Sequence, residues 1–464
     1  MLAIYIICSN LKIMRFKMPN AAYSKRYALC KNKTRIHKPK IENIMKHLLI
    51  ILLVMPTFLL GQVWENTYGY GTGYSVEQTT DEGYIVIGSG LDYVNCIYMI
   101  KTDQQGDTLW TKYHHLNTRE LFCSGLQTAD DGYIITGLTD HLDYWHNDVF
   151  LLKTDSNGDT LWSKVYGGSN DEVGVSVQQT ADGGYIITGW SDSFSSSHQV
   201  YLIKTDSEGE MMWSKTYGDD YEYIGRSVIQ TNDGGYFITG YGHTYPPGGS
   251  AWVYLIKTDS IGNVLWTTTF DDVNEDFGHS GKQTNDGGYI ITGGTDRLNN
   301  ISDLLLMKTS ANGEIDWVKT YGENNTFETG YCVQQTFDGG YIITGQKETN
   351  NNAVDVYLIR TDSDGDTLWT RTYGGSSMDR GYFVQQTTDG GYVITGVKDY
   401  YVYIIKTDSN GITVSITEIP ISNPNRKLVR MLDLSGKEIF KPKKNIPYIE
   451  IYDDGTTQKK MILK

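Results

Sequence analysis

Aromatic side chains that suit carbohydrate or protein binding gather in one part of the sequence, between residues 144 and 252. Exposed tryptophan and tyrosine rings stack on sugar rings or anchor a protein partner. The corresponding later stretches, 299–300 and 350–352, are polar asparagines. The alternative is that these rings fold back and pack locally. The candidate ligand-binding residues are Tyr144, Trp145, His146, Trp190, Tyr221, Tyr223, Tyr241, Tyr245 and Trp252.

Patterns for catalysis are weaker. The sequence contains no Gly-Xaa-Ser-Xaa-Gly elbow and no phosphate-binding loop, and its histidines lack the spacing of a zinc site. Two carboxylates can hydrolyse a glycosidic bond, but in an acidic chain such pairs arise by chance. We therefore predict no catalytic residue and expect binding rather than turnover. The carboxylates that an enzyme would draw on are Asp219, Asp220, Asp271, Asp272 and Asp276.

Several turns resemble calcium loops. Asp362-Ser-Asp364-Gly-Asp366 alternates oxygen ligands, but the equivalent turn elsewhere reads Asp259-Ser-Ile-Gly-Asn263. The fixed element is the glycine, as a hairpin turn requires, and no bidentate Glu follows at EF-hand spacing. We therefore predict no metal site and no cofactor, with calcium the one ion that the sequence leaves open.

A repeat of about 51 residues must position these side chains. Seven tryptophans mark it, and after a first gap of 46 their spacings are 52, 51, 53, 51 and 52 residues. Seven Gly-Tyr pairs keep step with them. Such a period indicates a repeat architecture. The tryptophans are Trp64, Trp110, Trp162, Trp213, Trp266, Trp317 and Trp369.

Each repeat reads as four short strands. In residues 176–217, strand candidates at 176–180, 185–189, 200–205 and 212–217 are separated by glycine turns and a variable polar stretch. Four antiparallel strands in this length are typical of a propeller blade. Each Trp is expected to pack between neighbouring blades, and each Thr-Gly to mark a close backbone approach.

The ends of the repeat region predict a closed ring. The first segment, 63–68, matches only the fourth strand, whereas the last repeat supplies three strands and ends at Gly411. Pairing these pieces removes two open sheet edges. We therefore predict an all-β, seven-bladed β-propeller over residues 62–411, with the N-terminal strand closing the last blade.

Loop lengths distinguish the two faces of this propeller. The connections from strand one to two and from three to four keep constant lengths. The loop after strand two varies from 7 residues, between Gly396 and Tyr403, to 14, between Gly240 and Tyr254. We call the face with the variable loops and the blade-to-blade connections the variable face. It is the expected binding surface, although relaxed selection on exposed loops gives the same pattern.

Charge and cysteine content narrow the function classes. Residues 62–464 carry 29 Lys/Arg and 54 Asp/Glu, a net charge of −25. This charge excludes nucleic acid as the expected partner, because its phosphates would be repelled. Three cysteines after residue 61 are too few for a disulfide framework, so a packed core must provide stability.

The N-terminal region predicts secretion. Residues 1–44, with ten Lys/Arg and one acid, read as an upstream extension that is not part of the native protein. Residues 45–61 read as a signal peptide, because a charged start precedes a 13-residue apolar run, Leu48 to Leu60, too short to span a membrane. No transmembrane anchor is expected after its cleavage.

The C-terminal segment, 412–464, differs in style and is net positive from residue 413 onward. It contains Asn423-Pro-Asn425, Leu432-Asp-Leu-Ser-Gly-Lys-Glu438 and Lys459-Lys-Met-Ile-Leu463. In this order the motifs resemble the C-terminal sorting domain of the type IX secretion system of Bacteroidota. The resemblance implies a small β-sandwich-like domain, interaction with that secretion machinery, and release or attachment at the outer-membrane surface. The Asn-Pro element departs from the family's usual Pro-Asn-Pro.

The repeats themselves resemble secreted bacterial propeller-repeat proteins. The shared consensus runs Trp, Tyr-Gly-Gly, Gln-Thr, Asp-Gly-Gly-Tyr, Thr-Gly and Lys-Thr-Asp, and residues 63–411 match it throughout. That family implies no catalytic motif for this chain. We expect a secreted, non-enzymatic module that binds a glycan or a surface protein. The alternatives are a polysaccharide-active, endoglucanase-type enzyme and a structural surface component.

Overall fold

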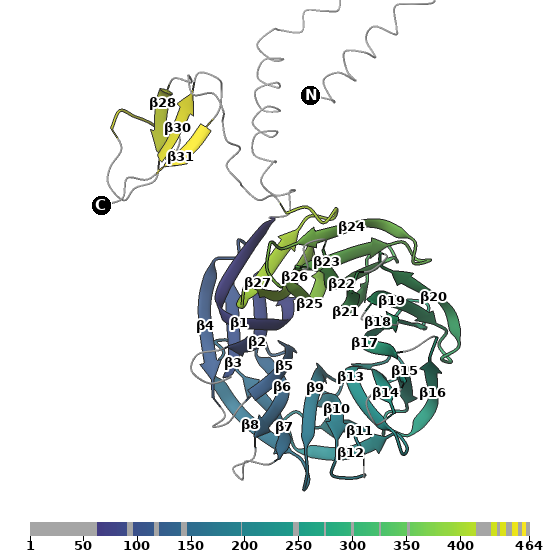
Figure 1. The fold of residues 1–464 in the computed structure, drawn as a ribbon. Helices are drawn as coiled ribbons and strands as arrows, with labels where there is room; N and C mark the ends of the chain where they lie inside the picture. Colours follow the sequence, from purple (N-terminus) through teal and green to yellow (C-terminus); the bar gives the residue numbers. More distant parts are fainter. Residues whose placement is uncertain are drawn as a thin grey trace, which may run out of the picture. The chain divides into compact units, whose positions relative to one another are not determined.

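The computed structural model describes residues 63–464 with internal gaps (Figure 1). Residues 1–62, including the expected extension and signal peptide, lie outside the described residues. The gaps are 91–95, 116–119, 141–145, 196, 245–249, 273–274, 298–300, 324–325, 350–352, 414–427, 434–436, 442–447, 453–456 and 461–464. Among the described residues, every regular element is a β-strand, and no helix occurs that could span a membrane.

The chain is a seven-bladed β-propeller, as the repeat predicts. Its blades are antiparallel sheets arranged around a central opening (Figure 1). The innermost strands are β1 (Trp64–Gln78), β5 (Glu120–Gln127), β9 (Glu172–Gln179), β13 (Glu222–Gln230), β17 (Glu275–Gln283), β21 (Glu328–Gln335) and β25 (Arg380–Gln386). The second strands are β2 (Tyr84–Gly90), β6 (Tyr133–Asp140), β10 (Tyr185–Ser191), β14 (Tyr236–His243), β18 (Tyr289–Arg297), β22 (Tyr341–Glu348) and β26 (Tyr392–Lys398).

The outer strands complete the blades. The third strands are β3 (Cys96–Thr102), β7 (Asn147–Thr154), β11 (Gln199–Thr205), β15 (Ala251–Thr258), β19 (Ile301–Thr309), β23 (Val354–Thr361) and β27 (Tyr401–Thr407). The fourth strands are β4 (Thr108–His114), β8 (Thr160–Tyr166), β12 (Met211–Tyr217), β16 (Val264–Phe270), β20 (Ile315–Tyr321) and β24 (Thr367–Tyr373). Within the described residues, no fourth strand of the seventh blade follows β27.

The N-terminal strand fills that place. The first half of β1 pairs antiparallel with β27, with Trp64 opposite Lys406 and Thr67 opposite Tyr403. After an irregularity, the second half of β1 becomes the innermost strand of the first blade and pairs with β2. One strand therefore belongs to two blades and closes the ring, which removes the two exposed sheet edges.

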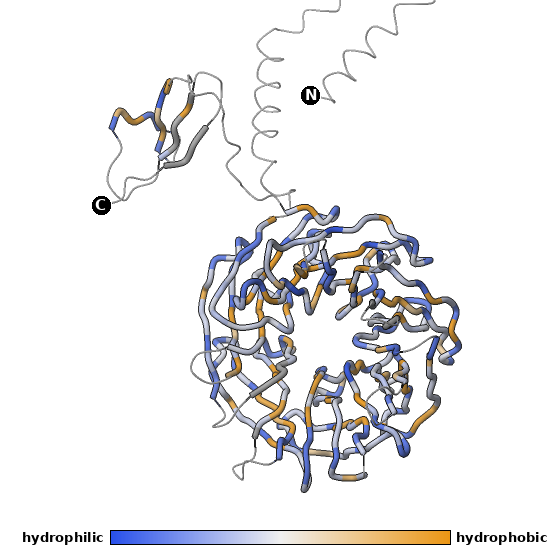
Figure 2. Tube along the Cα trace, in the orientation of Figure 1, coloured by the Kyte–Doolittle hydropathy of each residue, from blue (hydrophilic) through white to orange (hydrophobic). Residues whose placement is uncertain are grey.

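The core lies between neighbouring blades. Most residues of the second and third strands are buried, including all seven residues of β3 and of β11. Figure 2 shows hydrophobic stretches along the strands of the blades. Each Trp of a fourth strand contacts the Tyr that begins the second strand of the next blade. Across seven such pairs the ring centroids lie 5.7–6.2 Å apart. The expectation that these tryptophans pack between blades is confirmed.

Glycines make two close approaches possible. A Cβ on Gly240, in the Thr-Gly pair of β14, would lie 2.0 Å from the carbonyl oxygen of Ile224 on β13. Gly234, in the hairpin before β14, has a φ of +80°, and the same turn position holds Glu82 at +67° in the first blade. The turn therefore prefers glycine but tolerates another residue at this φ.

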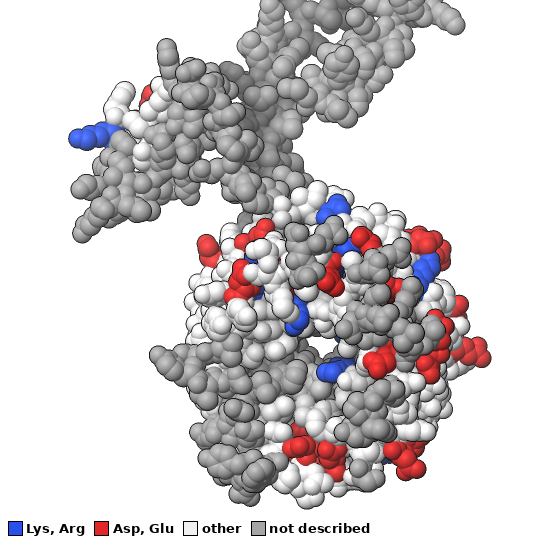
Figure 3. All heavy atoms as spheres, in the orientation of Figure 1, with Lys and Arg blue, Asp and Glu red and all other residues white. Residues whose placement is uncertain are grey.

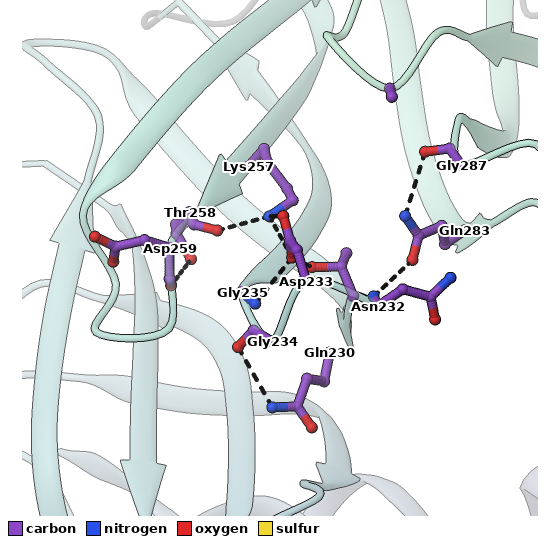
Figure 4. A network of polar contacts seen from close by, with 12 residues as sticks. Gln230, Asn232, Asp233, Gly234, Gly235, Lys257, Thr258, Asp259, Gln283 and Gly287 are labelled. Atoms are coloured by element: carbon purple, nitrogen blue, oxygen red, sulfur yellow. Dashed lines mark hydrogen bonds and ion pairs between the residues drawn. The ribbon is translucent and has the colours of Figure 1, made fainter.

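A buried basic side chain fixes the first hairpin of each blade, and Figure 4 shows the one that Lys257 holds. Asp233 accepts hydrogen bonds from the Thr231 hydroxyl, the Gly235 amide and Lys257 Nζ, which lies 2.9 Å from Asp233 Oδ2. Burial raises the pKa of Asp233, but these hydrogen bonds together lower it to about 2. The same Lys–Asp pair recurs in six blades, and Arg360 with Asp338 replaces it in the other.

The C-terminal segment contains a separate sheet. Its described strands are β28 (Leu428–Asp433), β29 (Glu438–Ile439), β30 (Tyr448–Tyr452) and β31 (Thr457–Lys460), in the order β29-β28-β30-β31. The turn after β28 is held by Asp433, whose Oδ1 accepts from the Lys437 amide at 2.9 Å. This Asp–Lys turn is the central part of the motif quoted above.

Candidate functional site

The central opening of the propeller contains a cavity of about 400 Å³. The innermost strands form the walls of the cavity. In each strand, the residue five positions before the closing Thr lines one end of the cavity, which we call its upper part. Because these strands run from the variable face toward the constant face, this position lies nearer the variable face. The described residues at this position are Tyr74, Val175, Arg226, His279, Tyr331 and Tyr382.

Aromatic rings form a continuous arc around part of the cavity. The ring of His279 lies 5.5 Å from Tyr331, Tyr331 lies 5.2 Å from Tyr382, and Tyr382 lies 5.3 Å from Tyr74. These residues come from four successive blades. The opposite wall is built from small or aliphatic residues, including Ser124, Gly125 and Val175. The cavity is therefore one-sided, although the blades are nearly equivalent.

Arg226 stands at the end of this arc. Its Nη2 donates to the Tyr241 hydroxyl at 3.1 Å, and its guanidinium carbon lies 5.4 Å from the centre of the Tyr241 ring. Tyr241 in turn packs edge-on against Phe277, with ring centroids 4.9 Å apart, and Phe277 stacks with His279. A cation–π contact and one hydrogen bond hold the arginine, and no carboxylate of the described residues pairs with it.

The electrostatics of the cavity keep its histidine neutral. His279 is partly accessible from the cavity but surrounded by protein atoms, and this desolvation, with the charge of Arg226, lowers the pKa of His279 to about 3. Burial and the neighbouring Tyr382 raise the pKa of Tyr331 to about 12, against the opposing charges of Arg380 and Arg226. At neutral pH both rings are therefore uncharged.

The lower part of the cavity holds one acid and one base. Glu77 and Lys282 both line it. Glu77 accepts a hydrogen bond from the Gln127 amide at 2.8 Å. Burial raises the pKa of Glu77, and the opposing effects of this bond and of Lys282 are smaller.

A polar group of histidine and carboxylate side chains extends from the cavity across the variable face. His243 Nε2 lies 2.9 Å from Glu222 Oε2, and His198 Nδ1 lies 3.5 Å from the same oxygen. His198 Nε2 lies 3.2 Å from Asp192 Oδ2, and the Trp190 ring packs on His198 at 4.3 Å. Two of the predicted aromatics therefore lie at the site. Trp190 contacts His198 of this polar group, and Tyr241 contacts Arg226 at the cavity.

Three other predicted aromatics pack against one another. Tyr221 and Tyr223 both meet the Trp252 ring edge-on, at 5.5 and 6.0 Å, and Tyr223 also contacts Tyr254. Tyr223 is buried, whereas Tyr221 is exposed. His146 is exposed, and Tyr144, Trp145 and Tyr245 lie outside the described residues. Local packing, the alternative considered for these rings, thus describes the Tyr221–Tyr223–Trp252 cluster.

The carboxylates that an enzyme would use do not line the cavity. Asp219 accepts from the Tyr223 hydroxyl and the Tyr221 amide, both at 3.1 Å, and lies with exposed Asp220 in the loop before β13. Asp276 is fully buried and accepts from the Asp272 amide at 2.7 Å, while Asp271 and Asp272 are exposed. These contacts stabilise the blade-to-blade loops.

The calcium-like turns use their first aspartate as a backbone acceptor. Asp362 Oδ1 accepts from the amides of Asp364 and Asp366, at 3.0 and 2.8 Å. Asp259 does the same with Ile261 and Asn263. In the part of the chain that the structure describes, no three His, Cys, Asp or Glu side chains are grouped as metal ligands.

The sequence patterns did not predict the residues that line the cavity. The signal that could have found them is positional. Beside an almost constant Gln-Thr, the residue five before the Thr changes type from blade to blade, from Val175 to Arg226 to His279 to Tyr331. At such a repeat position the residue type changes from blade to blade while its neighbours stay constant. Where the position also faces the propeller axis, it indicates a surface residue that does not pack within the blades.

Comparisons with known proteins assign no family to this chain. No family model and no curated protein sequence matches this chain. Among solved structures, the Pan2 WD40 domain of Neurospora crassa is similar at 11% identity and a TM-score of 0.47, covering 76% of this chain and 98% of that one. The puromycin hydrolase S511A mutant complexed with PGG is similar at 11% identity and a TM-score of 0.48, covering 83% of this chain and 59% of that one.

A third solved structure, a protein of Dyadobacter fermentans described as of unknown function, is similar at 12% identity and a TM-score of 0.43. It covers 64% of this chain and 96% of that one. At these identities, none of the three likenesses assigns a ligand or a reaction to this chain.

Proposed function

We propose that this protein is a secreted, non-enzymatic binding module that holds a glycan in the central cavity, entered from the variable face. The observation that carries the proposal is the one-sided arc of His279, Tyr331, Tyr382 and Tyr74. Sugar rings present apolar faces that stack on aromatic rings, and their hydroxyls pair with phenols and imidazoles. A cavity of about 400 Å³ is in the range of small-ligand sites.

Binding suits this cavity better than hydrolysis does. Glycosidases need two carboxylates on either side of the scissile bond. Among the residues that line the cavity, the acidic one is Glu77, and its carboxylate is engaged by the Gln127 amide. The buried acid Asp276 holds a loop instead of facing the cavity.

Export is the second part of the proposal. A signal peptide at residues 45–61 would bring the chain to the periplasm, and the sorting segment at 412–464 would engage the type IX machinery. The net charge of −25 over residues 62–464 suits a soluble extracellular protein. The destination is the outer-membrane surface or the medium.

A glycan array on the secreted protein tests the binding proposal. We expect one glycan class to bind, and we expect Tyr331→Ala and Tyr382→Ala to weaken that binding at least tenfold. Trp190→Ala, on the variable face outside the cavity, is the matched control and should change it little. Loss of binding with Trp190→Ala alone would move the site to the outer face. Turnover of a glycan would make the protein an enzyme, and no binding at all would favour a structural surface component.

A further inference from the structure

The central cavity is basic in a protein that is strongly acidic. Residues 62–464 carry a net charge of −25, yet the described cavity lining contains Arg226 and Lys282 against the single acid Glu77. Figure 3 shows basic groups at the rim of the central opening and acidic groups mainly farther out. This local excess of basic side chains requires an explanation. In an acidic protein, nearby carboxylates would ordinarily pair with a basic side chain and neutralise its charge.

The described residues engage the guanidinium of Arg226 only in part. A guanidinium carries five N–H donors, and one bond, to Tyr241, is described for it. Its Nε is buried and has no hydrogen-bond partner. An unpaired buried donor costs free energy, so a partner from outside the chain would be favourable.

A second arginine, Arg380, lies two residues before Tyr382 on the same strand, β25. The Nε of Arg380 is also buried without a partner. Burial lowers the pKa of Arg380, but a side-chain hydrogen bond with Tyr382 and the nearby phenols of Tyr331 and Tyr74 raise it. The two arginines stand on either side of Tyr331, whose titration both of them influence.

Among the described residues around Arg226, no side chain supplies the missing anion. On its own strand, Glu222 is engaged by His243 and lies beyond Tyr241. From the neighbouring strand β17, His279 and Lys282 face the cavity, and neither is an acid. From β1, Glu77 lies in the lower part and accepts from the Gln127 amide.

We propose that the ligand of the cavity carries a carboxylate, which pairs with the guanidinium of Arg226, while its sugar ring stacks on the aromatic arc; this inference rests on the proposed function. The ligand class is an oligosaccharide that contains a uronic acid. A carboxylate matches the fork of N–H donors on an arginine, and a sugar ring matches the tyrosines beside it.

A matched pair of sugars tests this inference. Trigalacturonic acid and its methyl ester share one sugar backbone and differ in the charge of the carboxyl groups and in the added methyl groups. By calorimetry on the full secreted chain, we expect the acid to bind at least tenfold more tightly than the ester, because charge-assisted hydrogen bonds are worth about that much. Arg226→Gln should abolish the preference and leave the ester's affinity unchanged. Arg226→Lys, which keeps the charge but not the fork, should retain part of it.

Arg371→Gln is the control, because Arg371 lies on the outer strand β24, where it stacks on Trp369. It should leave the preference intact, and circular dichroism of each variant checks folding. Equal binding of acid and ester, or a preference that survives Arg226→Gln, overturns the carboxylate assignment and leaves the proposed glycan binding standing. Tighter binding of a sulfated trisaccharide than of the acid also overturns it. If no glycan of any class binds, both proposals fall.

Discussion

Gln78 and Thr388 are 310 residues apart in the sequence, yet Gln78 Oε1 accepts a hydrogen bond from the Thr388 amide at 2.9 Å. The same bond joins each pair of neighbouring blades, from the Gln that precedes the closing Thr to the first hairpin of the blade before it. The other six bonds measure 2.8–3.2 Å. Gln78 therefore completes a ring of seven equivalent bonds.

Replacing Gln78 tests whether closure uses the same interaction as the other blade junctions. We expect Gln78→Ala to lower the free energy of unfolding by about 1 kcal/mol, the usual net value of one such bond. Gln230→Ala removes the equivalent bond to the Ala181 amide, 2.8 Å, and should cost the same. Urea unfolding measures both. A cost for Gln230→Ala with none for Gln78→Ala would contradict closure by this bond.

The Lys–Asp pairs predict acid sensitivity. The pKa values of Asp182, Asp233 and Asp286 are each lowered to about 2 in the folded chain, from about 3.8. A lowered folded pKa means that the stabilisation is complete above about pH 4 and is lost as the pH falls toward 2. Asp233→Asn should therefore lose less stability than the native protein between pH 5 and pH 2.5, measured by the urea midpoint. An identical pH dependence of the two proteins would refute this role.

The repeated tryptophans predict a packing effect. Trp213 contacts Tyr236 of the next blade and lies against the turn glycine Gly262, where an added Cβ would come within 3.0 Å of its ring. Trp213→Ala should destabilise the chain by about 3 kcal/mol, the lower end for a buried tryptophan, because part of the ring is exposed. Phe337→Ala, at a side chain that is 74% exposed, should change stability by less than about 0.5 kcal/mol. Similar effects for both in thermal unfolding would contradict the interblade role.

Secretion has a separate test. Deleting residues 413–464 removes the expected sorting segment and leaves the propeller strands intact, so the truncated protein should accumulate in the periplasm. Cell fractionation and immunoblotting measure this. A deletion of residues 2–44, upstream of the expected signal peptide, should leave export unchanged. Normal export of the C-terminally truncated chain would refute the sorting interpretation.

The architecture could be predicted from the sequence because its signals are periodic. Trp64 stands one strand before the first complete repeat, and that offset predicts closure against the last blade. The Lys257–Asp233 pair could not be seen in this way, because Asp233 lies in a hairpin turn and Lys257 on β15, and the two meet only in the folded blade. The fate of the aromatics depends on loop conformation, so Tyr223 and Tyr221 have the same sequence signal but opposite exposure.

The cavity was harder still to predict. Tyr74 and Tyr382 are 308 positions apart, and only the closed ring brings their rings within 5.3 Å. Arg226 looks like an ordinary strand residue until the axis of the propeller places it beside Tyr241 and His279. Periodicity predicts which positions face the axis, whereas the chemistry there depends on seven strands meeting at once.

The central claim is that the ligand lies in the central cavity. The most direct measurement is a crystal structure of the secreted protein with the glycan that binds it most tightly. We predict a sugar ring in van der Waals contact with Tyr331 and Tyr382 inside the ring of innermost strands. A glycan bound instead on the outer strands, or at the Tyr221–Trp252 cluster with the cavity unchanged, would contradict the account.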